Sequence, residues 1–153
     1  MAKIGFIGVG IMGAPMAGHL RKAGHQLYVY ARHKSAAELE AAGFTACDSP
    51  RDVGERAETI VLMLPNTPQV ESVLFAAQGV AEGLKAGKLV IDMSSISPIA
   101  TRQFAERLAS RGVDYLDGLA ILNVVAGTPC FMPLNDLGEA SLQHQDIQRP
   151  LHP

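Results

Sequence analysis

The feature that most constrains this chain is a glycine-rich break between an apolar segment and a helix-like segment near the N-terminus. Residues 3–7 read Lys-Ile-Gly-Phe-Ile, and residues 8–13 then form the pattern G-x-G-x-x-G. The stretch from Met16 to Lys22 follows at once and has the composition of a helix. This strand–turn–helix context is typical of a dinucleotide-binding site, whereas isolated glycines would equally suit a merely structural turn.

Three glycines of this run have separate expected roles. Gly8 allows a sharp turn out of the strand. Gly10 lets the backbone approach a pyrophosphate with no Cβ in the way, and Gly13 lets the helix pack closely on the strand. The helix would then direct its N-terminal amide groups at the phosphates.

The choice of cofactor is expected to depend on the residues after the second apolar segment, 26–30. An acidic side chain about 20 residues past the glycines binds the ribose 2′-hydroxyl of NAD. This chain instead has Ala-Arg-His-Lys at 31–34, and its first carboxylate after that is Glu38. Arg32 can stack on the adenine and donate paired hydrogen bonds to a 2′-phosphate. We therefore favour a cofactor-binding role for these residues over a solvated charge cluster at the start of a helix. The cofactor expected is NADP(H), with NAD(H) as the second choice.

Composition limits the partners of the chain. Its 153 residues suffice for one domain with a core. A net charge of −2 gives no basic footprint for nucleic acid. No apolar run approaches the ~18 residues of a membrane span, and Lys3 interrupts the N-terminal run, which is therefore not a signal peptide. Cys47 and Cys130 lack metal-site spacing and are expected to be free thiols in a reducing cytoplasm.

Strand and helix patterns alternate along most of the chain. We expect strands at 3–8, 26–30, 44–46, 58–63, 88–92 and 113–116, and helices at 12–23, 35–42, 50–56, 67–76 and 98–110. The strands are continuous apolar runs, as in parallel sheets that are buried on both faces. Ser49, Thr67 and Ser97 each precede a proline and are predicted helix N-caps. The alternation predicts an α/β fold with a Rossmann-type, doubly wound parallel sheet.

Two further loops follow predicted strand ends. Residues 63–68 follow the fourth strand, and residues 92–98 follow the fifth. Open parallel sheets bind ligands at the carboxyl ends of their strands. The hydroxyl and amide groups of these loops suit the nicotinamide ribose of a dinucleotide, although simple helix capping explains them equally well.

The glycine run and these loops together resemble the β-hydroxyacid dehydrogenase family, which includes 3-hydroxyisobutyrate dehydrogenase. Residues 6–13 and 15–16 look like its cofactor signature, while residues 67–75 and 91–98 are most similar to its 2-hydroxy-3-oxopropionate (tartronate semialdehyde) reductases. The resemblance runs from residue 3 to Asp117. It implies a cofactor site formed by Ile7, Gly8, Val9, Gly10, Ile11, Met12, Gly13, Arg32, Met63, Leu64, Pro65, Asn66, Val70, Ser94 and Ser95.

The resemblance also implies a reaction. Members of the family transfer a hydride between the nicotinamide and a small 3-oxo or 3-hydroxy acid, and the full-length proteins are expected to form homo-oligomers. The protein must orient the substrate and supply a proton to the forming alkoxide. In the family a lysine of a C-terminal helical domain does this. Asp92 and Asp117 of this chain are interpreted as structural carboxylates.

The chain departs from the family after Asp117. The family continues with a substrate-binding Pro-Val-Ser-Gly-Gly segment, whereas this chain reads Gly-Leu-Ala-Ile-Leu-Asn at 118–123 and has no lysine after Lys88. Residues 133–153 show no helical apolar stripe and are expected to be loop or disordered.

We therefore expect residues 1–117 to form an NAD(P)-binding Rossmann domain without a catalytic residue or metal of its own. Residues 118–153 are expected to be an atypical tail from a truncated or frame-disrupted gene, so that the chain is inactive alone. Two alternatives remain: a non-catalytic dinucleotide-binding module, or an interaction module that oligomerises through apolar surface left bare.

Overall fold

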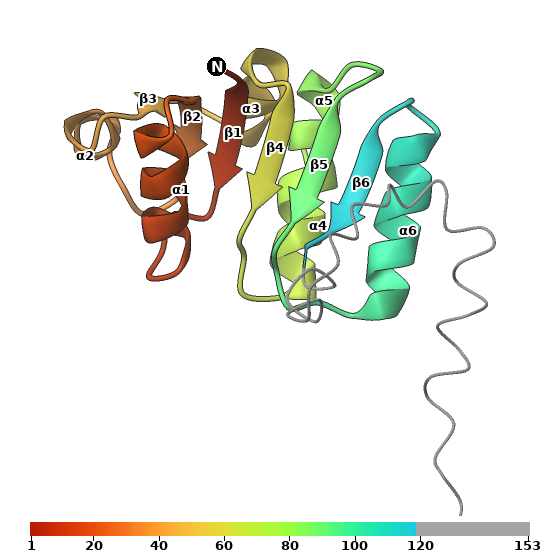
Figure 1. The fold of residues 1–153 in the computed structure, drawn as a ribbon. Helices are drawn as coiled ribbons and strands as arrows, with labels where there is room; N and C mark the ends of the chain where they lie inside the picture. The colour runs from red at the N-terminus through yellow and green to blue at the C-terminus, as the bar shows by residue number, and fades with distance from the viewer. Residues whose placement is uncertain (119–153) are drawn as a thin grey trace, which may run out of the picture.

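The computed structural model describes residues 1–118, which form a single parallel sheet flanked by helices (Figure 1). The strands are β1 (Lys3–Ile7), β2 (Gln26–Tyr30), β3 (Thr45–Ala46), β4 (Thr59–Leu62), β5 (Leu89–Asp92) and β6 (Asp114–Asp117). The helices are α1 (Gly13–Lys22), α2 (Ala36–Ala41), α3 (Pro50–Arg56), α4 (Thr67–Phe75), α5 (Val80–Gly83) and α6 (Pro98–Ala109). The strand order is β3-β2-β1-β4-β5-β6, so the predicted doubly wound fold is confirmed.

Strand β1 is the centre of this arrangement because it pairs with a strand on each side. Its register runs from Lys3↔Gln26 to Ile7↔Tyr30 against β2, and from Ile4↔Thr59 to Ile7↔Leu62 against β4. The two partners lie in opposite directions from β1, so the chain order reverses there. The carboxyl end of β1 therefore opens between the two halves of the sheet.

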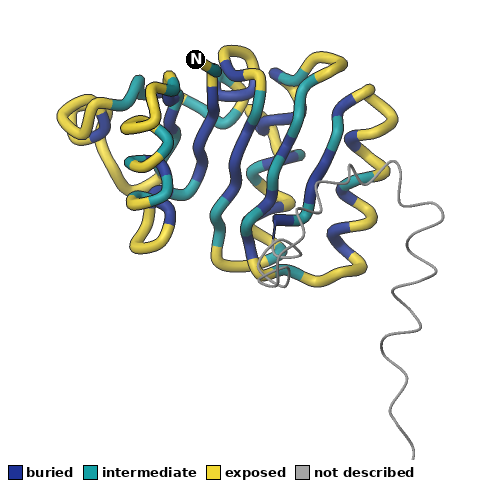
Figure 2. Tube along the Cα trace, viewed as in Figure 1, coloured by how far each residue is buried: buried dark blue, intermediate teal, exposed yellow. Residues whose placement is uncertain are grey.

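Both faces of the sheet are covered by helices. Helices α3, α4, α5 and α6 bury Val53, Val70, Val80 and Phe104 against one face. Helices α1 and α2 bury Ala17 and Leu39 against the other face, where Phe6 and Val29 are fully buried. Figure 2 shows the buried residues following the strands while the outer turns of the helices are exposed. The apolar runs of the sequence are thus buried strands, as predicted.

Two expectations about the helices are corrected. Helix α5 was not expected, because a single turn of four residues is too short to show a helical period. Helix α4 is capped by Asn66, whose Oδ1 accepts a hydrogen bond of 3.0 Å from the backbone N–H of Gln69, so the N-cap prediction for Thr67 is wrong. Ser49 caps α3 as expected, while Ser97 occupies the N-cap position of α6 without a side-chain hydrogen bond.

Cys47 is a free thiol buried under α3. Burial raises the pKa of this thiol to about 12, so it is a protonated apolar core residue at neutral pH. The expectations for Cys130 and for the segment 119–153 lie outside the described residues. Among residues 1–118, no helix has the length and apolar character that crossing a membrane requires.

Candidate functional site

The predicted site residues lie along one edge of the sheet, at the carboxyl ends of four neighbouring strands. The glycine loop follows β1, Arg32 follows β2, residues 63–66 follow β4, and Ser94 and Ser95 follow β5. In Figure 1 these loops lie at the lower ends of the strands. The edge includes the point between β1 and β4 where the strand order reverses, which is where open parallel sheets bind ligands.

The glycine loop is built around two close backbone contacts. Gly8 has φ +101°, and a Cβ on it would overlap the carbonyl group of Met63. A Cβ on Gly13 would overlap the carbonyl oxygen of Gly8 and lie 3.1 Å from the Phe6 ring. These two glycines are therefore required by the turn and by helix packing, in agreement with their expected structural roles.

Gly10 differs from both, because no protein atom lies within 4 Å of the position its Cβ would take. The fold itself would tolerate a side chain at this position. The absent Cβ leaves an open space on an exposed loop in front of α1. A cradle of this kind fits the close approach of a phosphate group to the backbone.

Helix α1 presents its N-terminus to this space. No side chain caps it, and its first turn carries no acidic residue that would compete with an anion. Ile11 and Met12, on the same loop, are 94% and 63% exposed. These exposed apolar side chains beside the helix N-terminus are therefore available to contact a ligand.

The loop after β2 carries an exposed positive charge, Arg32, and its nearest following carboxylate is engaged elsewhere. Glu38, the first carboxylate after this strand, is engaged in a capping box with Ser35 at the start of α2. Its Oε2 accepts hydrogen bonds of 2.8 Å from the backbone N–H and from the hydroxyl of Ser35. These hydrogen bonds hold the pKa of Glu38 below its usual value. Arg32 is exposed on this loop, and the carboxylate of Glu38 is committed to the helix.

The loops after β4 and β5 are joined by hydrogen bonds that sequence reasoning missed. The Leu64 N–H donates to Ser94 Oγ at 2.9 Å, and the Ser94 N–H donates to Asp92 Oδ1 at 2.9 Å. The Tyr115 hydroxyl donates to Asp92 Oδ2 at 2.5 Å. The one available signal was a charged residue, Asp92, ending the apolar strand 89–92 and followed two residues later by serine.

Burial separates the predicted cofactor residues into two groups. The side chains of Ile7, Val9, Val70 and Ser94 are buried, so these residues can reach a ligand only through their backbone. The exposed group consists of Gly10, Ile11, Met12, Arg32, Pro65, Asn66 and Ser95. Gly13 is buried at the helix start, while Gly8, Met63 and Leu64 are half-buried. Their assignment to a cofactor stays a prediction.

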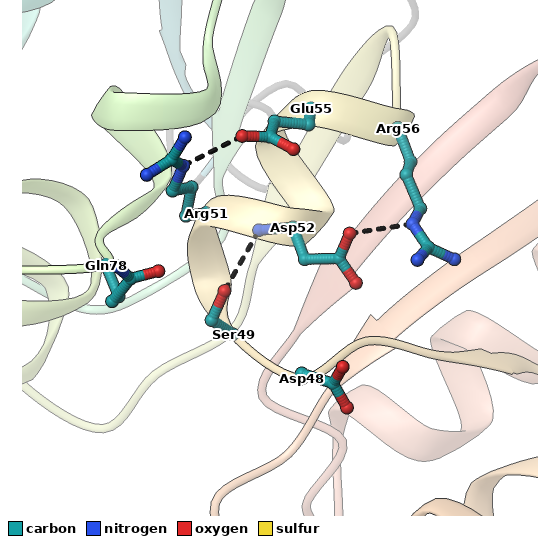
Figure 3. A pocket seen from close by; sticks show the side chains of 7 residues that line it. All are labelled: Asp48, Ser49, Arg51, Asp52, Glu55, Arg56 and Gln78. Carbon is teal, nitrogen blue, oxygen red and sulfur yellow. Dashed lines mark hydrogen bonds and ion pairs between the residues drawn. The ribbon is translucent and has the colours of Figure 1, made fainter.

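A separate hollow of about 280 Å³ lies beside α3 (Figure 3). It is lined by Asp48, Ser49, Arg51, Asp52, Glu55, Arg56 and Gln78. Arg51 pairs with Glu55 at 2.8 Å and Arg56 pairs with Asp52 at 2.7 Å, so its charges largely satisfy one another. The hollow contains none of the predicted site residues. Among residues 1–118, no group of histidine, cysteine and carboxylate side chains could hold a metal ion.

The comparison with known families shows which kind of domain carries this glycine turn. The family described as the NAD binding domain of 6-phosphogluconate dehydrogenase matches residues 3–118. The chain belongs to this family of NAD-binding domains. The resemblance expected from the glycine run and the two loops is confirmed, and it covers all but the first two of the described residues.

Relatives of this NAD-binding domain are hydroxyacid dehydrogenases and aldehyde reductases. The chain is 49% identical over 115 residues to 2-hydroxy-3-oxopropionate reductase of Escherichia coli, covering 75% of this chain and 39% of that protein. It is 41% identical over 132 residues to E. coli 3-sulfolactaldehyde reductase, covering 84% and 44%. The structure of Mycobacterium tuberculosis 3-hydroxyisobutyrate dehydrogenase with L-serine superposes with a TM-score of 0.68 at 28% identity, covering 75% and 39%.

The alignments with these relatives cover only part of each relative. The chain spans less than half the length of the relatives it matches. A match over 84% of the 153 residues also continues past Gly118, into the segment that we expected to be frame-disrupted.

Gly10→Val is expected to weaken dinucleotide binding without unfolding the NAD-binding domain. The valine would fill the open space in front of α1, and overpacking of ~1–3 kcal/mol corresponds to a loss of about fivefold to a hundredfold in affinity. Gly18→Val is the matched control, since Gly18 in α1 also has no atom within 4 Å of its Cβ position. Nicotinamide fluorescence titration and thermal unfolding of both variants make the measurement. Undiminished binding by Gly10→Val would show that the phosphates bind elsewhere.

Asp92→Asn is expected to change how stability depends on pH. Burial raises the pKa of Asp92 in the folded state, against lowering by its hydrogen bonds from Ser94 and Tyr115. The wild-type chain therefore loses stability as the pH rises from the unfolded-state pKa of about 3.9 through the folded-state pKa. The asparagine lacks this titration, so its free energy of unfolding should rise relative to wild type across the same window. Urea unfolding curves that stay parallel between pH 4 and 8 would contradict this.

Proposed function

We propose that residues 1–117 form an NADP(H)-binding domain that presents the nicotinamide to a small 3-oxo acid. The observation that carries the proposal is the open cradle at Gly10, in front of the uncapped N-terminus of α1 and at the reversal point of the sheet. Phosphate oxygens there would accept hydrogen bonds from backbone N–H groups and lie in the positive end of the helix dipole.

The end of β2 would hold the adenosine half of the cofactor. Arg32 can stack on the adenine and donate paired hydrogen bonds to a 2′-phosphate, with His33 and Lys34 beside it. A ribose 2′-hydroxyl would need a carboxylate acceptor, and Glu38 is already bound to Ser35. This distribution of charge supports NADP(H) over NAD(H).

The loops after β4 and β5 would then receive the nicotinamide half, because they lie on the other side of β1. Met63, Leu64, Pro65 and Asn66 would form one wall of this half of the site, and the exposed Ser95 belongs to the next loop. The bound cofactor would supply the hydride, and these loops would orient the ring and limit its contact with water. The 49% identity to 2-hydroxy-3-oxopropionate reductase supports a small 3-oxo acid as the substrate class, with 3-hydroxyisobutyrate-type substrates second.

The proton donor for this reaction would come from outside the described residues. Lys88, the last lysine of the chain, precedes β5 at the opposite edge of the sheet. Its ammonium group donates to the carbonyl oxygens of Gly54 and Glu55 at the end of α3. We therefore assign no catalytic residue to residues 1–117.

Exchange of Arg32 tests the cofactor assignment. The wild-type chain should bind NADPH more tightly than NADH, and Arg32→Asp should reverse this order, because a carboxylate repels a 2′-phosphate and accepts from a 2′-hydroxyl. Loss of a hydrogen bond to a charged group is expected to lower NADPH affinity about tenfold to a hundredfold. Arg102→Asp, at an exposed position of α6, makes the same change of charge on an element that does not follow β2. Equal affinities of the wild type for both cofactors would refute the assignment.

The 153-residue chain is expected to bind NADPH without measurable reduction of 2-hydroxy-3-oxopropionate. A positioned general acid contributes typically ~10²–10⁴-fold, and substrate orientation contributes further. Joining the C-terminal part of E. coli 2-hydroxy-3-oxopropionate reductase after Asp117 should restore activity, and replacing the lysine of that part should remove it again. Absorbance of NADPH over time measures both. Robust turnover by the 153-residue chain would show that it supplies its own proton donor.

A further inference from the structure

A chain of hydrogen bonds crosses the ends of three neighbouring strands beneath the proposed nicotinamide loops. It begins at the Leu64 N–H after β4, which donates to Ser94 Oγ at 2.9 Å. The backbone N–H of Ser94 donates to Asp92 Oδ1, at the end of β5, at 2.9 Å. The Tyr115 hydroxyl of β6 donates to the other carboxylate oxygen at 2.5 Å. Asp92, Ser94 and Tyr115 are each only 2% exposed.

Leu64 is the residue at which the chain leaves the sheet. The Met63 N–H still donates to the Ile7 carbonyl at 2.9 Å, as a continuation of the β1–β4 ladder. The next N–H, that of Leu64, turns to Ser94 instead of to a strand. The path by which Pro65 and Asn66 leave the sheet is therefore set by the Ser94 hydroxyl.

The position of Ser94 is fixed in turn by Asp92. Asp92 Oδ1 accepts from the Ser94 backbone N–H at 2.9 Å, so the carboxylate fixes the position of Ser94, whose Oγ accepts from the Leu64 N–H. Tyr115 fixes the carboxylate from the opposite side, and the backbone N–H of Gly118 donates to the Asp92 carbonyl at 2.7 Å. Each group in the chain thus fixes the orientation of the next.

We propose that Asp92, Ser94 and Tyr115 are positioning residues for the nicotinamide half of the cofactor site. They set the backbone of Leu64 and Pro65 and contact no part of the cofactor. The inference rests on the proposed function. It gives Ser94 a positioning role, whereas its exposed neighbour Ser95 would contact the cofactor directly. If these residues had a purely structural role, substituting them would lower the stability of the chain and would weaken binding in both halves of the cofactor site equally.

The experiment compares two ligands that differ in the nicotinamide half. NADPH occupies the whole site, whereas adenosine 2′,5′-bisphosphate occupies only the end near Arg32. Ser94→Ala in the 153-residue chain should weaken NADPH binding about five- to tenfold, the effect of one lost hydrogen bond, and leave the affinity for adenosine 2′,5′-bisphosphate unchanged. The fluorescence of NADPH at saturation should also differ from wild type, because the ring loses its fixed surroundings.

Two further variants separate positioning from stability. Tyr115→Phe keeps the buried ring and removes only the hydroxyl, so it should shift NADPH affinity in the same direction by a smaller factor. Val113→Ala truncates a buried side chain at the opposite end of β6 and should lower the unfolding midpoint without changing either affinity. Equal losses for both ligands, or no loss for NADPH in Ser94→Ala and Tyr115→Phe, would overturn the inference. Binding of neither ligand by the wild type would overturn the proposed function and the inference with it.

Discussion

The geometry of the site depends on the turn that joins β1 to α1. At this turn the backbones of Gly8, Gly13 and Met63 approach one another so closely that a Cβ on either glycine would overlap a carbonyl group. The contact ties the first residue after β4 to the start of α1 and leaves Gly10 facing outward. One steric constraint thus aligns a helix N-terminus, a glycine cradle and the β4 loop along one edge.

Several charged side chains make hydrogen bonds or ion pairs within the domain, whereas Arg32 does not form an ion pair among residues 1–118. Glu38 takes part in the capping box of α2. Asp52 and Glu55 form ion pairs with arginines of their own helix, α3, and Lys88 donates a hydrogen bond to a backbone carbonyl oxygen near the end of α3. Within residues 1–118, Arg32 enters none of the ion pairs. Positive charge is therefore left at the carboxyl edge, where a phosphorylated ligand would use it.

The features that the sequence predicted are those decided by neighbouring residues. The G-x-G-x-x-G turn, the buried strands and the Ser49 cap each depend on a few consecutive positions. The Asp92–Tyr115 and Leu64–Ser94 hydrogen bonds join residues 23 and 30 positions apart, so no local pattern contains them. The N-cap at Asn66 was missed for a different reason: Asn66 and Thr67 are both suitable caps, and the backbone path decides between them.

Titration of the ¹⁵N-labelled chain with NADPH, followed by amide chemical shifts, tests whether the cofactor binds at the carboxyl edge of the sheet. We predict the largest shifts at residues 8–14, at 31–35, and in the loops 63–66 and 94–95. Residues around the polar hollow beside α3, such as Arg51 and Gln78, should stay unchanged. Shifts confined to that hollow, or no shifts at saturating NADPH, would contradict the assignment of the carboxyl edge as the cofactor site.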